Sequence, residues 1–182
     1  MNLATYLIAT ATLTLTPIVH AFELMSSDLQ AGKQMPKAQE YQGFGCNGDN
    51  RSPQLSWRDS PKGTKSYAIT MYDPDAPTGS GWWHWITYNI PADVRELPRD
   101  AGRPKSGLAP KGMVQHRNDY STFDFGGACP PEGDKSHRYQ FKIFALDVEH
   151  LDVPPESSAA LAGYMINAHK IGVAELEALY KR

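Results

Sequence analysis

The sequence predicts a mainly β protein with one helix near its C-terminus. Its 14 prolines and 15 glycines interrupt the 182-residue chain at short intervals, as turns between strands do. Between them lie short runs of β-branched and aromatic residues, which favour strands. No internal repeat, low-complexity tract or long linker divides the chain, so we expect a single globular domain.

Six segments are predicted as strands, because β-branched or aromatic residues fill them and turn residues bound them. In chain order they are residues 22–29, 54–57, 66–73, 84–90, 113–117 and 137–147.

The predicted helix begins after Ser157 and Ser158, either of which can cap its first turn. Apolar residues then recur at helical spacing, and we expect this stripe to pack on the sheet: Leu161, Tyr164, Met165 and Ala168. The tail 171–180 alternates too loosely to separate a strand from a second helix, and we favour a strand with a frayed or helical end.

Polar residues stand at the ends of three apolar strand faces. Alternation of side chains puts Asp73 at the end of one stripe, and His137 and Tyr139 at the start of another. His84 begins a third stripe, which continues through Ile86, Tyr88 and Ile90. If strands 66–73 and 84–90 form an antiparallel hairpin, Asp73 and His84 emerge at the same end of the sheet. Burying such groups without partners costs about 1–3 kcal/mol each, which favours a shared site over separate structural roles.

The charge balance limits the classes of partner. With 18 Lys and Arg against 20 Asp and Glu, the formal net charge is -2. No basic field is available to hold nucleic acid or an anionic membrane surface. Any anion must therefore be bound locally.

The first 21 residues carry no charged side chain and end in Val19-His20-Ala21. This pattern predicts a secretory signal peptide cleaved after Ala21, which leaves a domain of residues 22–182 in the periplasm or outside the cell. An uncleaved membrane anchor is the alternative. Threonines and Pro17 interrupt the segment and its length is marginal for a span, so we expect no stable membrane span after cleavage.

Export bears on the two cysteines, Cys46 in GFGCNGDN and Cys129 in GGACPP. In an oxidising compartment such a pair favours a disulfide, which would close a long loop, and two unpaired thiols are the alternative. A CxxC redox or zinc site is excluded, because neither cysteine has a second one nearby.

Three motifs together resemble the signatures of the phosphatidylethanolamine-binding protein family: DPDAP, the WHW that is followed by NIP, and GGACPPEGDKSHRY. They are most similar to the exported bacterial branch, called the Raf kinase inhibitor-like or YbhB/YbcL type. The likeness extends over essentially the whole mature chain, including GYMINAHKI in the predicted helix.

This resemblance implies a β-sandwich of a larger central sheet and a smaller sheet, with a small pocket that accepts phosphate or a similar anion. Carried over by motif, the pocket is lined by Asp73, His84, His137 and Tyr139. Its rim is shaped by Asp75, Ala76 and Pro77, and is approached by Pro131. The family also suggests a cis peptide bond before Pro77.

The expected chemistry of this pocket is hydrogen-bond donation to an anion by two imidazoles and one phenol. Asp73 would accept from a ring nitrogen of His84 or His137 and fix its tautomer. Trp82, Trp83 and Trp85 would wall the pocket or cover a head group, and packing in the core is the alternative for each of them. Many eukaryotic members have two consecutive histidines where this chain has Trp83-His84, so their ligand preference is not carried over. Kinase inhibition is not carried over either, because an exported protein has no obvious kinase target.

We therefore expect a binding protein for a phosphate-like anion or phospholipid head group, with no enzymatic activity, cofactor, metal or nucleic-acid partner. The alternative is a modulator of a protein partner, of the kinase- or protease-inhibitor kind, that uses the pocket rim. A hydrolase with His84, His137 and Asp73 as metal ligands or acid and base is the third hypothesis. It has no HExxH or GxSxG motif and no nucleophile beside the histidines. His116 and Arg117 are expected at the rim or in solvent.

Overall fold

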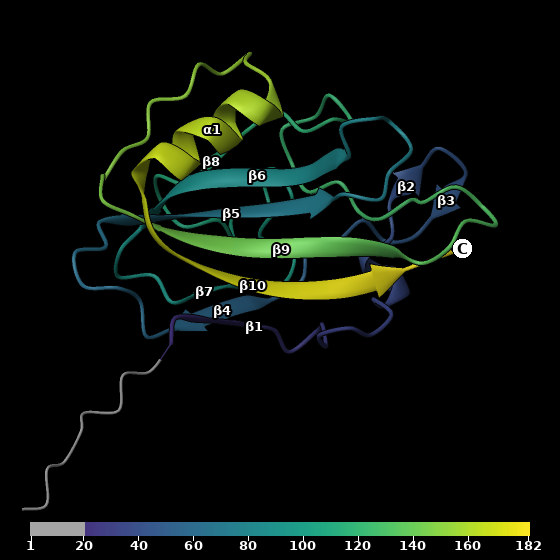
Figure 1. Cartoon of the computed structure of the whole chain (residues 1–182), viewed down its shortest axis with the longest axis horizontal. Helices are drawn as coiled ribbons and strands as arrows, with labels where there is room; N and C mark the ends of the chain where they lie inside the picture. The colour runs from purple at the N-terminus through teal and green to yellow at the C-terminus, as the bar shows by residue number, and fades with distance from the viewer. Residues whose placement is uncertain (1–20) are drawn as a thin grey trace, which may run out of the picture.

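The computed structural model describes residues 21–182, and the predicted signal peptide lies outside the described residues except for Ala21. At its centre is a five-stranded antiparallel sheet in the order β10-β9-β5-β6-β8 (Figure 1). Its strands are β5 (Ser66–Asp73), β6 (Trp82–Pro91), β8 (Val114–Gln115), β9 (His137–Leu146) and β10 (Lys170–Tyr180).

A smaller antiparallel sheet of order β1-β4-β7 lies over one face of the central sheet (Figure 1). It consists of β1 (Glu23–Met25), β4 (Leu55–Arg58) and β7 (Glu96–Leu97). A separate hairpin joins β2 (Gln42–Gly43) to β3 (Cys46–Asn47), after the short 3-10 helix η1 (Lys37–Gln39). The predicted β-sandwich of a larger and a smaller sheet is confirmed, whereas β2, β3, β7 and η1 were not predicted.

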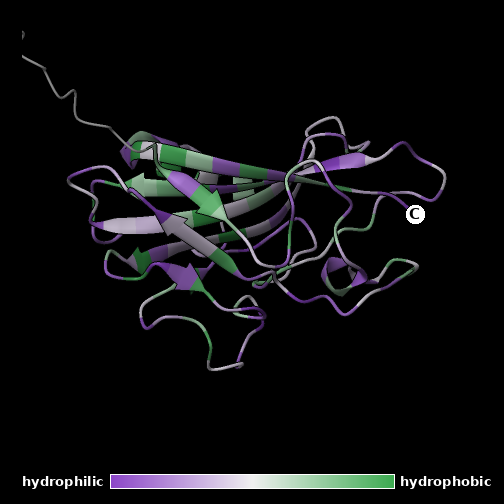
Figure 2. Cartoon of the chain, turned by 90° about the horizontal axis from the view of Figure 1, so that it is seen from below, coloured by the Kyte–Doolittle hydropathy of each residue, from purple (hydrophilic) through white to green (hydrophobic). Residues whose placement is uncertain are grey.

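Both faces of the central sheet are buried. The larger apolar cluster fills the space between the two sheets, and a second cluster lies under α1 (Ala159–His169) on the opposite face. Figure 2 shows hydrophobic stretches along the strands in the middle of the molecule. Because both sides are covered, every residue of β5 except Tyr72 is buried. Burial on both faces holds the end of this strand, where Asp73 lies, in a fixed position.

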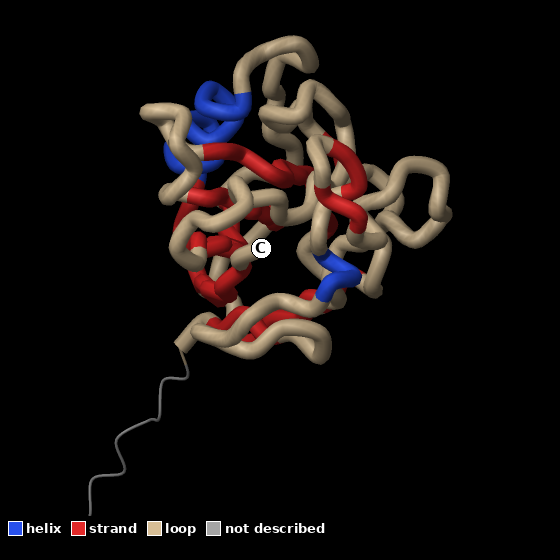
Figure 3. The backbone as a smooth tube through the Cα atoms, turned by 90° about the vertical axis from the view of Figure 1, so that its right-hand side faces the viewer, coloured by secondary structure: helices blue, strands red, loops and turns tan. Residues whose placement is uncertain are grey.

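Helix α1 packs on the sheet mainly with a different face from the one predicted, although Met165 of the predicted stripe does pack against the core. The side chain of Ser158 caps its start by accepting from the N–H of Leu161 at 3.2 Å. The buried residues are Ala159, Ala162, Gly163 and Ile166, whereas Tyr164 in the predicted stripe is 71% exposed. Small residues form the contact because the helix lies close to the sheet: a Cβ on Gly163 would be 3.1 Å from the Trp83 ring. Figure 3 shows α1 and η1 at separate edges of the strand framework.

The tail is a strand along its whole length. β10 pairs with β9 from Lys170 to Tyr180, and its alternate residues from Ala174 to Tyr180 face the larger core. The strand that we favoured is confirmed, and the frayed or helical end is wrong. Within residues 21–182, no helix has the length and apolar character needed to cross a membrane.

Two irregularities in β6 change the faces that simple alternation predicts. Met71 pairs with Trp85 and Tyr72 with Trp83, so His84 is an extra residue, a β-bulge. A second register shift lies near Asn89, whose φ is +59°. As a result, Ile86 and Tyr88 pack in the cluster under α1, while Trp85 and Ile90 join the larger core. The predicted continuous stripe from His84 to Ile90 is therefore wrong.

Candidate functional site

A cavity of about 220 Å³ opens at the end of the central sheet where β5 ends and β6 and β9 begin. Its polar floor, as we call it, consists of four residues that are each at most 4% exposed: Asp73, His84, His137 and Tyr139. The remaining lining residues form a mainly apolar collar: Phe44, Ala76, Pro77, Thr78, Trp82, Tyr120, Cys129, Pro130 and Pro131. The structure thus brings together the four residues predicted to line a pocket.

Antiparallel pairing explains why these residues meet. Asp73 is the last residue of β5 and pairs with Trp82, the first residue of β6. β9 starts at His137 and also runs antiparallel to β5. In an antiparallel sheet the end of one strand lies beside the start of its neighbours. The prediction that Asp73 and His84 emerge at the same end of the sheet is confirmed.

Asp73 and His137 form a buried pair in the polar floor. Nδ1 of His137 donates to Oδ2 of Asp73 at 2.8 Å, and Oδ1 of Asp73 accepts from the N–H of Asp75 at 2.8 Å. Nε2 of His137 lies 3.3 Å from Oδ2 of Asp134. Asp73 therefore orients His137, one of the two histidines considered as its partner.

His84 is held by backbone carbonyls instead. Its Nδ1 lies 2.9 Å from the carbonyl oxygen of Gly126 and 3.0 Å from that of Gly127. Carbonyl oxygens only accept, so Nδ1 carries the hydrogen. Burial lowers the pKa of His84 to about 4, against the opposing effect of Asp73. The ring is therefore neutral at pH 7 with an unprotonated Nε2, which favours an acceptor role for His84 over the donor role that we predicted.

Glycines are required where these carbonyls approach His84. A Cβ on Gly126 would lie 2.4 Å from the ring of Tyr120, and one on Gly127 would lie 2.4 Å from the carbonyl oxygen of Gln39. Real Cβ atoms do not come that close to other heavy atoms. The two glycines of GGACPP thus allow the backbone to reach the ring of His84.

Two hydrogen-bond donors at the cavity have no partner. The hydroxyl of Tyr139 and Nε1 of Trp82 are both buried, and neither forms a hydrogen bond with any residue from 21 to 182. Burial raises the pKa of Tyr139, and the nearby carboxylate of Asp73 raises it further through its charge and a weak side-chain interaction that is too poor in geometry to count as a hydrogen bond, so the hydroxyl keeps its hydrogen. Tyr120 differs, because its hydroxyl donates to the carbonyl of Gly127 at 3.0 Å.

The loop between β5 and β6 forms its reversal without a cis bond. No peptide bond within residues 21–182 is cis, so the bond expected before Pro77 is wrong. Gly79 and Gly81 have φ values of +79° and +68°, and Thr78 donates to the carbonyl of Gly81. Glycine adopts such positive φ values readily, which allows the chain to turn with every peptide trans.

Asp75 does not line the cavity. Its Oδ1 accepts from Nη2 of Arg138 at 2.7 Å, and its Oδ2 accepts from the backbone N–H and Nε of Arg138 at 2.9 Å each. This pairing lowers the pKa of Asp75. Asp75 therefore joins the loop to the start of β9, while Ala76, Pro77 and Pro131 line the cavity as expected.

The three tryptophans have three different places. Trp82 lies in the collar, Trp83 packs with α1 on the opposite face of the sheet, and Trp85 is in the larger core. His116 is not at the rim: it is 1% exposed, and its Nε2 donates to the carbonyl of Ser157 at 3.1 Å. Trp83 and Trp85 thus follow the core-packing alternative, and the expectation for His116 is wrong.

An aromatic stack that we did not predict contributes Tyr120 and Phe44 to the lining of the cavity. The rings of Tyr41 and Tyr120 stack at 4.0 Å between centroids, and Phe44 lies 5.8 Å from Tyr120. Phe44 is at the tip of the β2–β3 hairpin and is 74% exposed. These residues come from irregular loops with no periodic pattern, so the sequence carried no signal for them.

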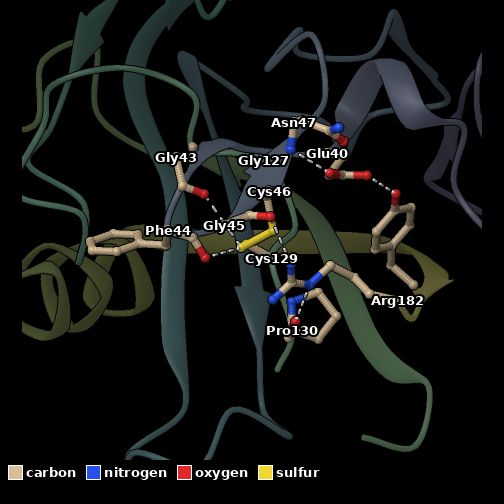
Figure 4. Close-up of a disulfide and its surroundings, with 12 residues drawn as sticks. Glu40, Gly43, Phe44, Gly45, Cys46, Asn47, Gly127, Cys129, Pro130 and Arg182 are labelled. Carbon is tan, nitrogen blue, oxygen red and sulfur yellow. Dashed lines mark hydrogen bonds between the residues drawn. A yellow bond between two sulfur atoms is a disulfide. The ribbon is translucent and has the colours of Figure 1, made fainter. Parts of the chain in front are cut away.

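A disulfide between Cys46 and Cys129 joins this hairpin to the loop that bears Pro130 (Figure 4). The prediction of a disulfide is confirmed, and the alternative of two free thiols is wrong. Arg182 adds a second connection, donating from Nε to the carbonyl of Pro130 at 2.8 Å and from Nη1 to that of Gly45 at 2.9 Å (Figure 4).

Comparison with known proteins gives consistent results. Residues 25–181 match the family model described as phosphatidylethanolamine-binding protein. The chain is 54% identical over 161 residues to the UPF0098 protein YbcL of Escherichia coli, covering 88% of each chain. It is 46% identical to the UPF0098 protein YbhB of the same organism, covering 87% of this chain and 99% of YbhB.

A solved structure also resembles it closely. The crystal structure of E. coli YbcL, described as a new member of the mammalian PEBP family, superposes with a TM-score of 0.87 at 53% identity. The match covers 90% of this chain and 99% of that one. The sandwich, the helix near the C-terminus and these similarities lead to one conclusion: the chain belongs to the phosphatidylethanolamine-binding protein family.

Proposed function

We propose that the protein binds a phosphate-like anion or a phospholipid head group in the cavity at the end of β5, without chemical turnover. The observation that carries the proposal is the pair of buried donors without partners, the hydroxyl of Tyr139 and Nε1 of Trp82. A buried polar group left unsatisfied costs about 1–3 kcal/mol. A ligand oxygen that accepts from these donors would recover that free energy.

The surroundings of the donors support an anion with a small organic substituent. The charge of Asp73 is shared with His137 and with the N–H of Asp75, which reduces its repulsion of an anion. The collar is mainly apolar, and the cavity of about 220 Å³ suits a head group rather than a larger molecule. The disulfide is consistent with function in an exported protein.

Tyr139→Phe tests this proposal because it removes only the hydroxyl. We expect phosphoethanolamine to bind this variant about tenfold to a hundredfold more weakly, as for loss of a hydrogen bond to a charged group. Stability should be unchanged or slightly higher, since the hydroxyl has no partner to lose. Titration calorimetry measures the affinity, and urea unfolding measures the stability.

The matched control is Tyr164→Phe, the same chemical change on the exposed face of α1. It should leave the affinity unaltered. Equal affinities in wild type, Tyr139→Phe and Tyr164→Phe would contradict the proposed role of the Tyr139 hydroxyl. Absence of any measurable binding to wild type would overturn the proposed function.

The alternative role, modulation of a protein partner through the rim, stays a prediction. Phe44 is the most exposed large apolar side chain of residues 21–182 and stands in the collar, where such a partner would meet it. Binding of that partner would then compete with phosphoethanolamine.

A further inference from the structure

The orientation of the His84 ring is fixed by its surroundings. Nδ1 donates to the carbonyls of Gly126 and Gly127, and the rings of Tyr120 and Tyr139 pack edge-on against the imidazole at 5.5 Å and 5.2 Å between centroids. Turning the ring over would place a C–H against the two carbonyls and break both hydrogen bonds. The ring therefore presents the same edge to the cavity at all times.

That edge carries a hydrogen-bond acceptor. Nε2 of His84 makes no hydrogen bond with any part of the chain from residue 21 onward, and His84 lines the cavity. With the hydrogen on Nδ1, Nε2 of the neutral ring has a lone pair and can only accept.

The groups that face His84 do not supply a hydrogen to Nε2. Asp73 from β5 and His137 from β9 already bond each other, and the hydroxyl of Tyr120 donates to Gly127. Tyr139 from β9 has a hydroxyl without a partner. Burial also keeps the imidazole neutral, because it lowers the pKa of His84 to about 4. The polar floor thus offers both a free donor, at Tyr139, and a free acceptor, at His84.

We propose that His84 makes the cavity selective for anions that retain one hydrogen, such as a phosphate monoester or phosphonate monoanion, over anions that have none, such as sulfates and sulfonates. The inference rests on the proposed function, because it concerns which anion the same cavity binds. Of the two proposed ligand sources it favours a free phosphate monoester over an intact phospholipid head group, whose phosphodiester has no P–OH hydrogen. A P–OH group donates to Nε2 while its other oxygens accept from the floor. A sulfonate oxygen in the same place has no hydrogen to donate, so its lone pairs and the lone pair of Nε2 repel each other.

Phenylphosphonate and benzenesulfonate form a suitable pair of probes, since they differ mainly in the hydrogen. At about pH 5, below the second ionisation of a phosphate-type group, both carry close to one negative charge. We expect wild type to bind phenylphosphonate at least about tenfold more tightly than benzenesulfonate, the size of one hydrogen bond to a charged group. Removing the remaining hydrogen by raising the pH should weaken phosphonate binding and leave sulfonate binding unchanged.

His84→Asn is the matched variant. The Asn side-chain N–H₂ takes the place of Nδ1–H and can still donate to Gly126 and Gly127, whereas nothing replaces Nε2. We expect this variant to bind the two probes about equally. Should it fail to fold, nitrogen NMR of His84 in wild type gives an independent test: a protonated Nδ1 and a bare Nε2 are expected, and a protonated Nε2 overturns the inference.

The calorimetric outcomes separate the two proposals. Equal binding of both probes by wild type overturns the selectivity of His84 and leaves anion binding intact. Unchanged preference for phenylphosphonate in a folded His84→Asn variant also overturns the inference, because the preference then has another source. Binding of neither probe overturns the proposed function and the inference with it.

Discussion

The properties of the polar floor depend on which side-chain atoms already have partners. Asp73 uses both carboxylate oxygens, for His137 and for the backbone of Asp75. His84 uses one ring nitrogen for two carbonyls, and Tyr139 uses its hydroxyl for none. Two residues of this floor thus have a free group to offer a ligand. Residue type alone would have assigned donor roles to both histidines.

The lowered pKa of His84 predicts acid sensitivity of the fold. In the unfolded chain the imidazole has a pKa near 6.5, whereas burial lowers it to about 4 in the folded protein. Between these values the unfolded state binds more protons, so the free energy of unfolding rises with pH. This contribution is fully present above pH 6.5 and is lost as pH falls towards 4. Its size is about 3 kcal/mol.

Urea unfolding of wild type and His84→Asn over this pH range measures the effect. Other groups titrate as well, so the difference between the two proteins isolates His84. We expect wild type to lose more stability than the variant between neutral pH and about pH 4. Parallel stability curves would show that the imidazole titrates alike in the folded and unfolded chains.

Among the elements, β6 has the largest effect on the site because it carries two register shifts. The bulge at His84 lets this residue line the cavity while the next residue, Trp85, joins the larger core. The shift near Asn89 exchanges the two faces again, so that Ile90 lies in the larger core although Tyr88 lies under α1. Asn89 is held by its side chain, whose Oδ1 accepts from the N–H of Leu151 at 2.7 Å.

Two substitutions at Asn89 test this second irregularity. Asn89→Ala loses the hydrogen bond to Leu151 and places an ordinary side chain at a φ of +59°. Asn89→Gly loses the same hydrogen bond but is unstrained there. We expect Ala to be more destabilising than Gly by about 1 kcal/mol, measured by urea unfolding. Equal losses would mean that the positive φ contributes no strain at this position.

At the scale of the whole molecule, covalent and polar links hold segments that are far apart in sequence around the cavity. The disulfide joins residues separated by 83 positions, and Arg182 contacts both of the segments that the disulfide connects. Tyr180 donates to Glu40, whose Oε1 accepts from the N–H of Asn47 beside the disulfide. The C-terminal end of β10 therefore supports the wall that carries Phe44.

Replacing both Cys46 and Cys129 by Ala should destabilise the protein. Without the disulfide the unfolded chain has more conformational entropy, which lowers the free energy of unfolding by about 4 kcal/mol or less for a loop of this length. We expect a lower midpoint of thermal unfolding, with weaker binding of phosphoethanolamine because the collar is no longer tied together. Wild type treated with a dithiol reductant should show the same decrease. An unchanged midpoint would show that hydrogen bonds alone hold these segments.

Much of the fold was predictable from local signals. Strand β5 has the predicted bounds, 66–73, because turn residues bracket a run of strand-forming residues. The cap at Ser158 located the helix, but the face it buries was missed. The spacing of large apolar residues predicted that Tyr164 is buried, whereas the buried face contains Gly163, because the helix packs closely on the ring of Trp83. A spacing pattern contains no information on how near the opposing surface lies.

The sequence by itself determined the strand-rich class, the family and the four residues that meet at the end of β5, because these follow from short-range patterns and specific motifs. Only the tertiary structure decided which of their atoms are free. His84 is a bare acceptor because the carbonyls of Gly126 and Gly127, more than forty positions away, occupy its other nitrogen. Donor and acceptor roles belong to contacts between distant segments, and a local sequence pattern cannot specify them.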